Sequence, residues 1–591
     1  MNFKKEISKA IKDSLASLGV PAVNFSLETP KLSSFGDYAT NAALLAGKKL
    51  NQPPLHIAQK IKEELSLLSS LSFVEEIKVA PPGFINFYLK PNFLLKASEE
   101  IISSRERLVS KTGEGKTVII DYSSPNIAKP FGVGHLRSTI IGQALYNLYA
   151  FLGYKVIGDN HLGDWGTQFG VLLYQVKRRG LSKKCRRAGK PKRNSDFRQN
   201  DDNEELKNLT IEDLENLYVE FHREAEKNPR LKEEAREWFK RLEEGDREAR
   251  KIWQKIVDLS MKEFSRVYKM LGVSFDVSLG ESFYQDKMAA VITDAQEKGL
   301  LCESQGAKVI FLPGEETPAM LVKSDGATTY LLRDLATIKY RQERWRPDLI
   351  IYEVGADQTF YFQQLFSVAS LLGYCSPEAL VHVAHGMILG LEGKFSTRSG
   401  KTIHLEAVLE EAIKKARKLT AEAGVAKKLS PKEQEKVAQA VGIGAVKYND
   451  LKQNPRTDII FNWEKMLTLE GNSGPYLQYT AARCFSVLEK SGRRSFENLP
   501  KIQLNQEELA IVRLSCHWDE VIFEAAQKFS PNLVADFLYQ LAQNYNHFYN
   551  QHQILQEERE KESLRLGLTA LTAKILEEGL GILGLEVLRK M

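Results

Sequence analysis

Residues 123–153, SSPNIAKPFGVGHLRSTIIGQALYNLYAFLG, join a loop rich in Ser, Pro and Gly to an amphipathic helix. A helix N-terminus leaves backbone N–H groups unpaired and carries partial positive charge, so it suits a phosphate group. Gly132 and Gly134 let a ligand approach the backbone closely, and Lys129 adds a mobile cation. His135 stands where the helix begins and could donate a hydrogen bond to a nucleotide. The loop therefore predicts a nucleoside triphosphate site, with a glycine-rich turn capped by His135 as the alternative.

The elements around this loop predict a parallel, doubly wound sheet of an α/β protein. A β-branched run at 117–123 precedes the loop, a helix is expected over 134–152, and the strand YKVIGDN follows Gly153. The pattern resumes with the strand LIIYEVG at 349–355, a helix over 359–372, and the apolar stretch LVHVAHGMIL at 380–389. Neither GxxxxGK[ST] nor GxGxxG occurs, which argues against a P-loop and a dinucleotide-binding motif.

Other segments flank and interrupt this α/β core. Residues 1–110 mix helical and strand-like patterns, including FINFYL at 84–89, and predict an α+β module. Segment 177–193 carries ten Lys or Arg, and acidic helical sequence follows; such a block is a solvated surface element unless it contacts RNA. From about residue 470 the chain is helical, and one predicted helix face repeats at four-residue steps through Leu533, Phe537, Leu541 and Tyr545.

Bulk composition limits the class of protein. A chain of 591 residues is long enough for several domains, and a net charge of +6 permits a polyanionic partner without requiring one. The five cysteines form no CxxC pair, which argues against a zinc knuckle or a disulfide framework and is typical of a reducing cytosol. No apolar run approaches the ~20 residues that a membrane helix needs, and no secretory signal is recognisable. We therefore expect a cytoplasmic protein without membrane contact.

Four blocks of sequence occur in order along the chain: DYSSPNIAKPFGVGHLRSTIIG, HLGDWGTQFG, SDGATTYLLRD and GPYLQY. Together they resemble the arginyl-tRNA synthetases, which are class I aminoacyl-tRNA synthetases, and the resemblance covers essentially the whole chain. It implies an N-terminal α+β domain over 1–110 that contacts tRNA. It further implies a Rossmann-type, parallel-sheet catalytic domain over 115–465, with a helical insertion at about 175–265. The implied C-terminal domain, over 470–591, is an all-α bundle that binds the anticodon.

The resemblance implies a ligase with a two-step reaction. Arginine and ATP would give arginyl-adenylate and pyrophosphate, and the arginyl group would then pass to the terminal ribose of tRNA(Arg). Mg²⁺ would arrive with ATP, and no protein-bound structural metal is expected. The implied partners are L-arginine, ATP and tRNA(Arg), and we expect a monomer.

The two nucleotide signatures of the family are altered in this chain. The HIGH signature corresponds to Gly132-Val133-Gly134-His135, with Gly132 in place of the first histidine. The KMSKS signature falls at 395–399 and lacks its second lysine, whereas Lys129 occupies the place of a lysine that many arginyl enzymes carry before HIGH. For Arg398 and Lys401, a solvated surface turn is the alternative. The resemblance implies catalytic roles for Lys129, His135, Arg398 and Lys401, and ATP contacts for Lys129, Gly132, Gly134, His135, Ser396 and Arg398.

Recognition of arginine needs a carboxylate that can meet the planar guanidinium in a bidentate fork. By resemblance Tyr330 and Asp334 line this pocket, and their spacing of four places them on one helical face. An ion pair of Asp334 with Arg333 or Arg341 is the alternative. Asp121, at the end of a strand, would be a second acidic contact. The implied arginine-binding residues are Asp121, Asn126, Tyr330, Asp334 and Gln358.

The tRNA contacts are implied by the family layout and by the stacking of unpaired bases on aromatic rings. The candidates are Asn86, Tyr476, Tyr479, Tyr545 and Met591, and packing inside the fold is the alternative for each. Two other functions stay open. One is a different class I synthetase, such as the glutamyl, glutaminyl or cysteinyl enzyme, although the last would need zinc ligands. The other is a non-catalytic tRNA-binding relative, because both nucleotide signatures are altered.

Overall fold

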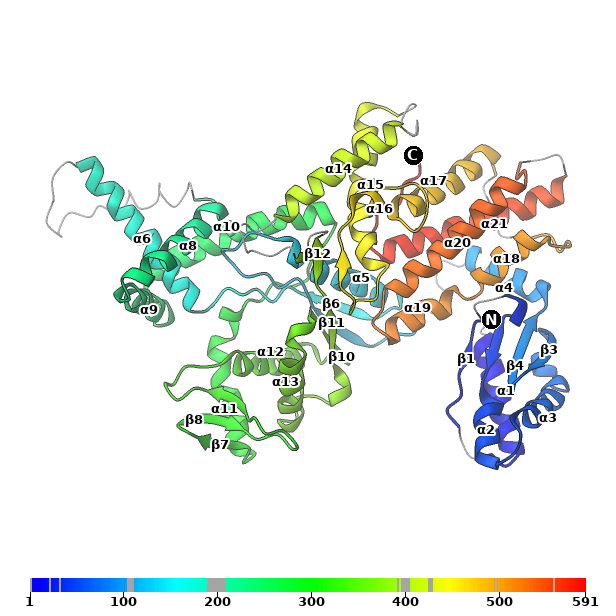
Figure 1. The fold of residues 1–591 in the computed structure, drawn as a ribbon, viewed down its shortest axis with the longest axis horizontal. Helices are drawn as coiled ribbons and strands as arrows, with labels where there is room; N and C mark the ends of the chain where they lie inside the picture. The colour runs from blue at the N-terminus through cyan, green and yellow to red at the C-terminus, as the bar shows by residue number, and fades with distance from the viewer. Residues whose placement is uncertain are drawn as a thin grey trace.

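The structure of the chain is a computed structural model. It describes residues 3–20, 23–30, 33–103, 111–188, 209–390, 393–394, 404–422, 429–493, 495–496, 498–555 and 558–590. Figure 1 shows an elongated molecule, with a central sheet between a helical arm on one side and an N-terminal module on the other. The C-terminal helices lie between the central sheet and that N-terminal module. None of the described helices is both long enough and apolar enough to cross a membrane.

The N-terminal module is built on an antiparallel sheet with the strand order β1-β2-β4-β3. Strand β4 is the FINFYL segment predicted from the sequence, and its Ile85, Phe87 and Leu89 side chains are buried. The alternation of the segment therefore gives one face to the core. The elements of the module are α1 (Phe3–Ser17), β1 (Leu27–Glu28), β2 (Tyr38–Thr40), α2 (Ala42–Leu50), α3 (Pro54–Ser66), β3 (Val74–Ala80), β4 (Phe84–Leu89) and α4 (Pro91–Ser103).

The central sheet has the order β11-β10-β5-β6, and all its pairs are parallel. Its strands are β5 (Thr117–Asp121), β6 (Lys155–Asp159), β10 (Leu349–Gly355) and β11 (Leu380–His385). Ile119, Ile120 and Ile351 are fully buried, as expected where helices cover both faces of a parallel sheet. The predicted strand at 117–123 ends at Asp121, because Ser123 and Ser124 have φ angles of 70° and 43° that turn the chain out of the sheet.

Three helices pack against this sheet and bring side chains to its carboxyl edge: α5 (Leu136–Phe151), α12 (Tyr330–Trp345) and α13 (Thr359–Leu371). Helix α5 starts two residues later than predicted because Val133–His135 form a separate 3-10 turn. Other 3-10 turns among the described residues are Ser33–Phe35, Ser69–Leu71, Glu281–Lys287, Ala356–Gln358 and Pro377–Ala379. Ligands bind beyond the carboxyl edge in open α/β sheets, so this is where a site is expected.

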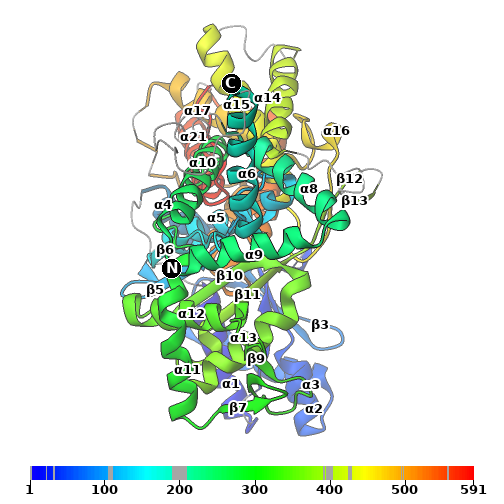
Figure 2. The same cartoon turned by 90° about the vertical axis from the view of Figure 1, so that its left-hand side faces the viewer.

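The insertion between β6 and β10 has two parts, which Figure 2 shows on opposite sides of the sheet. The described helices of the helical part are α6 (Thr167–Ala188), α8 (Ile211–Lys227), α9 (Arg230–Glu243) and α10 (Arg247–Leu271). The second part was not predicted, and it comprises α11 (Met288–Glu297) and the antiparallel strands β7 (Leu301–Ser304), β8 (Ala307–Ile310) and β9 (Ala319–Val322).

The start of the basic segment 177–193 forms ion pairs with the acidic helices of the insertion. Lys177 pairs with Glu248, Arg178 with Glu224, and Arg179 with Asp213. These contacts support the interpretation of this part as a surface element with its own counter-charges. Residues 189–193 lie outside the described residues.

After the sheet, β12 (Ile388–Gly390) pairs with β13 (Gly393–Lys394) and with β14 (Ile459–Ile460). The helices of the C-terminal half are α14 (Leu405–Glu422), α15 (Pro431–Leu451), α16 (Trp463–Met466), α17 (Gly474–Ser491), α18 (Gln506–Ser515), α19 (Trp518–Gln527), α20 (Asn532–Gln551) and α21 (Arg559–Ile582). Helix α20 buries Phe537, Leu541 and Tyr545, the face that the four-residue repeat predicts.

Candidate active site

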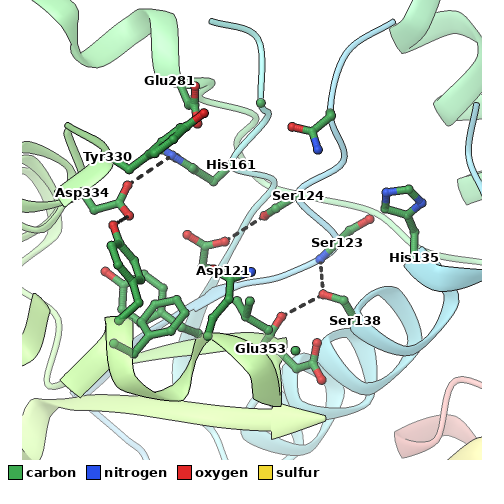
Figure 3. Close-up of a pocket in the computed structure, with 18 of the residues that line it drawn as sticks. Asp121, Ser123, Ser124, His135, Ser138, His161, Glu281, Tyr330, Asp334 and Glu353 are labelled. Carbon is green, nitrogen blue, oxygen red and sulfur yellow. Dashed lines mark hydrogen bonds and ion pairs between the residues drawn. The ribbon is translucent and has the colours of Figure 1, made fainter. Parts of the chain in front are cut away.

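A cavity of about 600 Å³ opens at the carboxyl edge of the central sheet. Figure 3 shows that its two sides carry different side chains. One side, which we call the acidic end, holds His161, Glu281, Tyr330 and Asp334. The other, which we call the helix end, holds Ser123, His135, Ser138 and Glu353.

Short hydrogen bonds hold the loop between β5 and α5 against its neighbours. The Ser123 amide donates to Ser138 Oγ at 2.9 Å, and the Ser138 hydroxyl donates to the Glu353 carbonyl at 2.8 Å. The Ala128 amide donates to Ser260 Oγ of α10 at 2.9 Å. The loop is therefore fixed to α5, to β10 and to the insertion, although its sequence is rich in turn-forming residues.

The helix end presents the N-terminus of α5 to the cavity. The His135 amide donates to the Gly132 carbonyl at 3.0 Å, the Leu136 amide donates to the Val133 carbonyl, and the His135 side chain makes no cap bond. Burial lowers the pKa of His135, so the ring is neutral near pH 7, and its Nδ1 lies 3.3 Å from the Gly132 carbonyl. Lys129 is exposed and lines the cavity, as does Gly134. An anion would meet the positive end of the helix dipole and a cation here.

Part of the predicted nucleotide site lies outside the described residues, namely Ser396, Arg398 and Lys401. The described residue that follows this segment is His404, whose backbone forms a bridge with Gly132. The Leu405 amide donates to the Phe131 carbonyl at 2.9 Å. The chain therefore returns from the altered KMSKS segment directly beside GVGH.

The acidic end centres on Asp334, in the second turn of α12. Thr329 caps this helix by accepting from the Leu332 amide, so that Tyr330 and Asp334 face the cavity together. The Tyr361 hydroxyl donates to Asp334 Oδ2, and His161 Nε2 lies 3.9 Å from Oδ1. Burial raises the pKa of Asp334, while His161 and the Tyr361 hydroxyl oppose that rise. A cationic ligand would favour the ionised carboxylate.

A second carboxylate at this end, Glu281, was not predicted. Its Oε2 lies 3.0 Å from Arg333 Nη1, yet neither atom has an aligned hydrogen-bond partner among the described residues. Burial raises the pKa of Glu281 to about 7, and the charge of Arg333 limits that rise. Glu281 comes from the 3-10 turn between the helical part of the insertion and α11, and no local motif marks it in the sequence. His161, by contrast, follows β6 directly, and its place beyond a strand end could have indicated it.

Asp121 lines the cavity but has internal partners. Its Oδ2 accepts from Arg341 Nη2 at 2.6 Å, and the same nitrogen lies 2.7 Å from Asp159 Oδ2. Arg341 is fully buried, and Asp121 also accepts from the Ser124 hydroxyl. Arg341 and Arg333 therefore pair with carboxylates other than Asp334, so the ion pair offered as the alternative for Asp334 does not form.

The remaining predicted arginine-binding residues also line the cavity. Asn126 is exposed in the loop, where its backbone bridges to Gly163. Gln358 is exposed at the start of α13. Tyr330 is 64% exposed, and the Arg333 guanidinium lies 5.4 Å from its ring centroid. The fold thus brings all five predicted residues to one cavity.

The predicted tRNA contacts are distributed unevenly. Tyr476 and Tyr479 are half-buried on α17, and Arg483 lies over the Tyr479 ring at 4.7 Å. Tyr545 is fully buried, so the prediction that its ring stacks on an anticodon base does not fit the structure; the ring packs in the helical core. Asn86 is 4% exposed on β4 and so offers little surface to a partner. Met591 lies outside the described residues.

The described residues contain no group of three or more His, Cys, Asp or Glu side chains that could hold a metal ion. The cavity instead combines carboxylates at one end with a helix N-terminus and a lysine at the other. This arrangement can hold a cation and an anion next to each other, which suits a reaction between a positively charged carboxylic acid and a nucleotide phosphate.

Three family models match the chain. The catalytic domain of class I (R) tRNA synthetases matches residues 98–188 and 194–463. The N-terminal domain of arginyl tRNA synthetase matches residues 2–89, and the DALR anticodon binding domain matches 477–591.

Individual relatives match over their full length. The arginine–tRNA ligases of Clostridium botulinum (strain 657 / Type Ba4) and Clostridioides difficile (strain 630) are each 38% identical to this chain, with 100% of both partners covered. The arginyl-tRNA synthetase structures from Plasmodium falciparum and Thermus thermophilus each give a TM-score of 0.82 at 24% identity. Each match covers 100% of this chain. It also covers 99% of the Plasmodium falciparum chain and 100% of the Thermus thermophilus chain, so all three share one fold.

Proposed function

We propose that this chain, which belongs to the arginyl-tRNA synthetase family and is an arginine–tRNA ligase, activates arginine in the cavity of Figure 3. The observation that carries the assignment of the site is the separation of charge inside one cavity. Carboxylates gather at the acidic end, and a helix N-terminus with Lys129 stands at the helix end. Arginine and ATP have the complementary charges.

The guanidinium of arginine occupies the acidic end in this proposal. Asp334 is held by Tyr361 on one oxygen, and its other oxygen is 3.9 Å from His161, which leaves room for a donor. Glu281 Oε2 has no aligned partner and can accept a second N–H. A planar guanidinium with several donors satisfies two carboxylates that a single ammonium would not. Tyr330, Asn126 and Gln358 contact the rest of the amino acid, and Asp121 adds negative potential.

ATP occupies the helix end, with its phosphates toward the first amides of α5. Gly134 and His135 line the cavity and contact the nucleotide, and Lys129 neutralises charge on the phosphates. Gly132 is buried behind them and is assigned a contact through its backbone. Mg²⁺ comes with the nucleotide. We also assign nucleotide contacts to Ser396, Arg398 and Lys401, which precede His404 in the sequence. The backbone of His404 bridges to Gly132. The protein's part is to hold the arginine carboxylate in line with the α-phosphate, so that pyrophosphate leaves as the adenylate forms.

The arginyl group then passes to the terminal ribose of tRNA(Arg). We assign tRNA contacts to the N-terminal region over 1–110 and anticodon contacts to the helical region over 470–591, with Tyr476 and Tyr479 as stacking candidates. The intervening region, 115–465, performs catalysis. We further propose that the chain acts as a cytoplasmic monomer.

Parallel charging of total tRNA with each amino acid tests the assignment. With ATP and Mg²⁺ present, we expect arginine alone to become attached, because only its guanidinium fits the acidic end. Controls without ATP and without tRNA separate true charging from background binding. Charging with another amino acid would contradict the proposal, and charging with none would indicate a non-catalytic relative.

A further inference from the structure

A buried pair of side chains at the helix end is not among the residues assigned to arginine or ATP. Glu353 on β10 and His385, the last residue of β11, meet with Oε1 and Nδ1 2.9 Å apart. The Glu353 side chain is fully buried, and that of His385 is 12% exposed. Both residues line the same cavity as His135 and Ser138. The pair therefore stands at the wall of the cavity, at the carboxyl ends of two central strands.

The pair is unusual for its surroundings. Strands β10 and β11 are otherwise largely apolar, and a buried carboxylate with only one oxygen paired is unfavourable there. Glu353 Oε2 has no hydrogen-bond partner among the described residues. Packing alone would favour an apolar residue at such a site. The pair is therefore better explained by contact with a ligand in the cavity than by packing.

The second ring nitrogen of His385, Nε2, lies near Gly355. Strand register places His385 opposite Gly355, which also lines the cavity. A side chain on Gly355 would begin 3.8 Å from His385 Nε2 and 2.6 Å from Asp357 Oδ1, so the glycine leaves space beside the ring edge, and the Asp357 carboxylate borders that space. Among the described residues no hydrogen bond is made by Nε2, whereas Nδ1 is engaged by Glu353. An imidazole held at one nitrogen presents the other in a fixed direction.

We propose that His385 contacts the nucleoside part of ATP through Nε2–H, with Glu353 as the residue that positions its ring. This inference rests on the assignment of ATP to the helix end. The phosphates lie at the first amides of α5, so the cavity wall formed by Gly355, Glu353 and His385 is left for the ribose or the purine ring. Both carry acceptor atoms that suit an imidazolium donor.

The charges around His385 favour its protonated form. Glu353 faces it from β10, Arg137 from α5, Asp450 from α15, and His382 from its own strand. Arg137 and Asp450 pair with each other at 3.0 Å, so the effects of their opposite charges on His385 largely cancel. Burial lowers the pKa of His385, but the charge and hydrogen bond of Glu353 outweigh this and raise the pKa overall. Asp458 Oδ1 accepts a hydrogen bond from the amide of Met387, two residues after His385, at 2.7 Å.

Substitution of His385 by Asn tests the contact. The Asn amide can replace Nδ1–H toward Glu353 but cannot replace Nε2. We expect His385→Asn to raise the KM for ATP about tenfold in arginine-dependent charging, which is the usual loss for one hydrogen bond to a charged donor. The KM for arginine and the Tm should stay near the wild-type values. The control His382→Asn changes a histidine of the same strand, whose Nε2 meets the Val354 carbonyl at 3.1 Å, and should leave the KM for ATP unchanged.

The positioning role of Glu353 is tested by pH. A donor at Nε2 is present while His385 is protonated, so the wild-type KM for ATP should rise as the pH increases through the raised pKa of His385. Glu353→Gln removes the charge that raises this pKa, so the same rise should move to lower pH. In His385→Asn the rise should disappear. A merely structural role of Glu353 would lower the Tm without moving the profile.

Two inhibitors locate the contact on the nucleotide. Adenosine should inhibit His385→Asn about tenfold more weakly than it inhibits the wild type, whereas tripolyphosphate should inhibit both equally. A weakened response to tripolyphosphate, or a KM for ATP within twofold of wild type, would overturn the proposal. These outcomes require that the wild type charges arginine. If it does not, the proposed function itself has failed, and the two failures are thus distinct.

Discussion

Arg137 and Asp450 form a fully buried ion pair, with Nη2 and Oδ1 3.0 Å apart. Arg137 Nε also donates to both carboxylate oxygens at 3.1 Å, and Nη1 donates to the Thr457 carbonyl at 2.6 Å. Arg137 follows His135 by two residues on α5, whereas Asp450 lies near the end of α15, which packs on α17 of the C-terminal bundle. The N-terminus of α5 is therefore locked to the C-terminal half of the chain.

Removal of one partner of this pair should be strongly destabilising. Asp450→Asn leaves the Arg137 guanidinium buried without its counter-charge, at a cost of about 3–5 kcal/mol. We expect a clear fall in the Tm, measured by scanning calorimetry. The double variant Arg137→Met, Asp450→Leu should recover a large part of the loss, because neither charge remains. A Tm of Asp450→Asn equal to that of the wild type would contradict the role of the pair.

Lys129 should contribute to the first chemical step. Its ammonium is exposed at the helix end, where charge develops on the departing pyrophosphate. Lys129→Ala should slow arginine-dependent exchange of pyrophosphate into ATP about a hundredfold, measured with tRNA present, while the KM for arginine changes little. Lys129→Arg keeps the charge and should retain more activity. Near-normal exchange by Lys129→Ala would remove Lys129 from the mechanism.

Asp334 should control the affinity for arginine. Asp334→Asn keeps the shape of the side chain and its contact with Tyr361 but removes the charge that meets the guanidinium. We expect the KM for arginine to rise about 30-fold, equivalent to about 2 kcal/mol for a charged hydrogen bond, with the KM for ATP nearly unchanged. Tyr361→Phe, which only loosens the carboxylate, should have a smaller effect. An unchanged KM for arginine in Asp334→Asn would refute the assignment.

Glu281 should make arginine binding sensitive to pH. Burial raises the pKa of Glu281 to about 7, so the carboxyl group takes up a proton as the pH falls from 8 to 6. The negative charge at the acidic end then decreases, and the KM for arginine should rise on the acid side, measured at saturating ATP. In Glu281→Gln the KM should be higher at pH 8 and nearly constant over this range. A wild-type KM for arginine that does not change between pH 6 and 8 would contradict this role.

Local patterns predicted those parts of the fold that depend on nearby residues. The run LIIYEVG is β10 at its predicted bounds, and the repeat through Leu541 and Tyr545 marks the buried face of α20. The same repeat also argues against Tyr545 as an RNA contact, because a residue on the core face of a helix is buried. The strands β7–β9 were missed because they are short and lie inside a long insertion.

The site was only partly predictable because its charges are paired across long stretches of chain. Asp334 is implied by the resemblance of SDGATTYLLRD to the family, and the four-residue spacing places it on the same helical face as Tyr330. Glu281 has no such signal, because it reaches the acidic end from a turn inside the insertion and its partner Arg333 lies 52 positions later. The pairing of Asp121 with Arg341, 220 positions apart, likewise has no local signal, because it forms only when α12 packs against the central sheet.

A crystal structure with L-arginine bound tests the central claim most directly. We expect the guanidinium at the acidic end, with its N–H groups within hydrogen-bond distance of Asp334 and Glu281, and the arginine carboxylate directed toward the N-terminus of α5. A bound arginine whose guanidinium pointed to solvent or to the helix end, away from both carboxylates, would contradict the account.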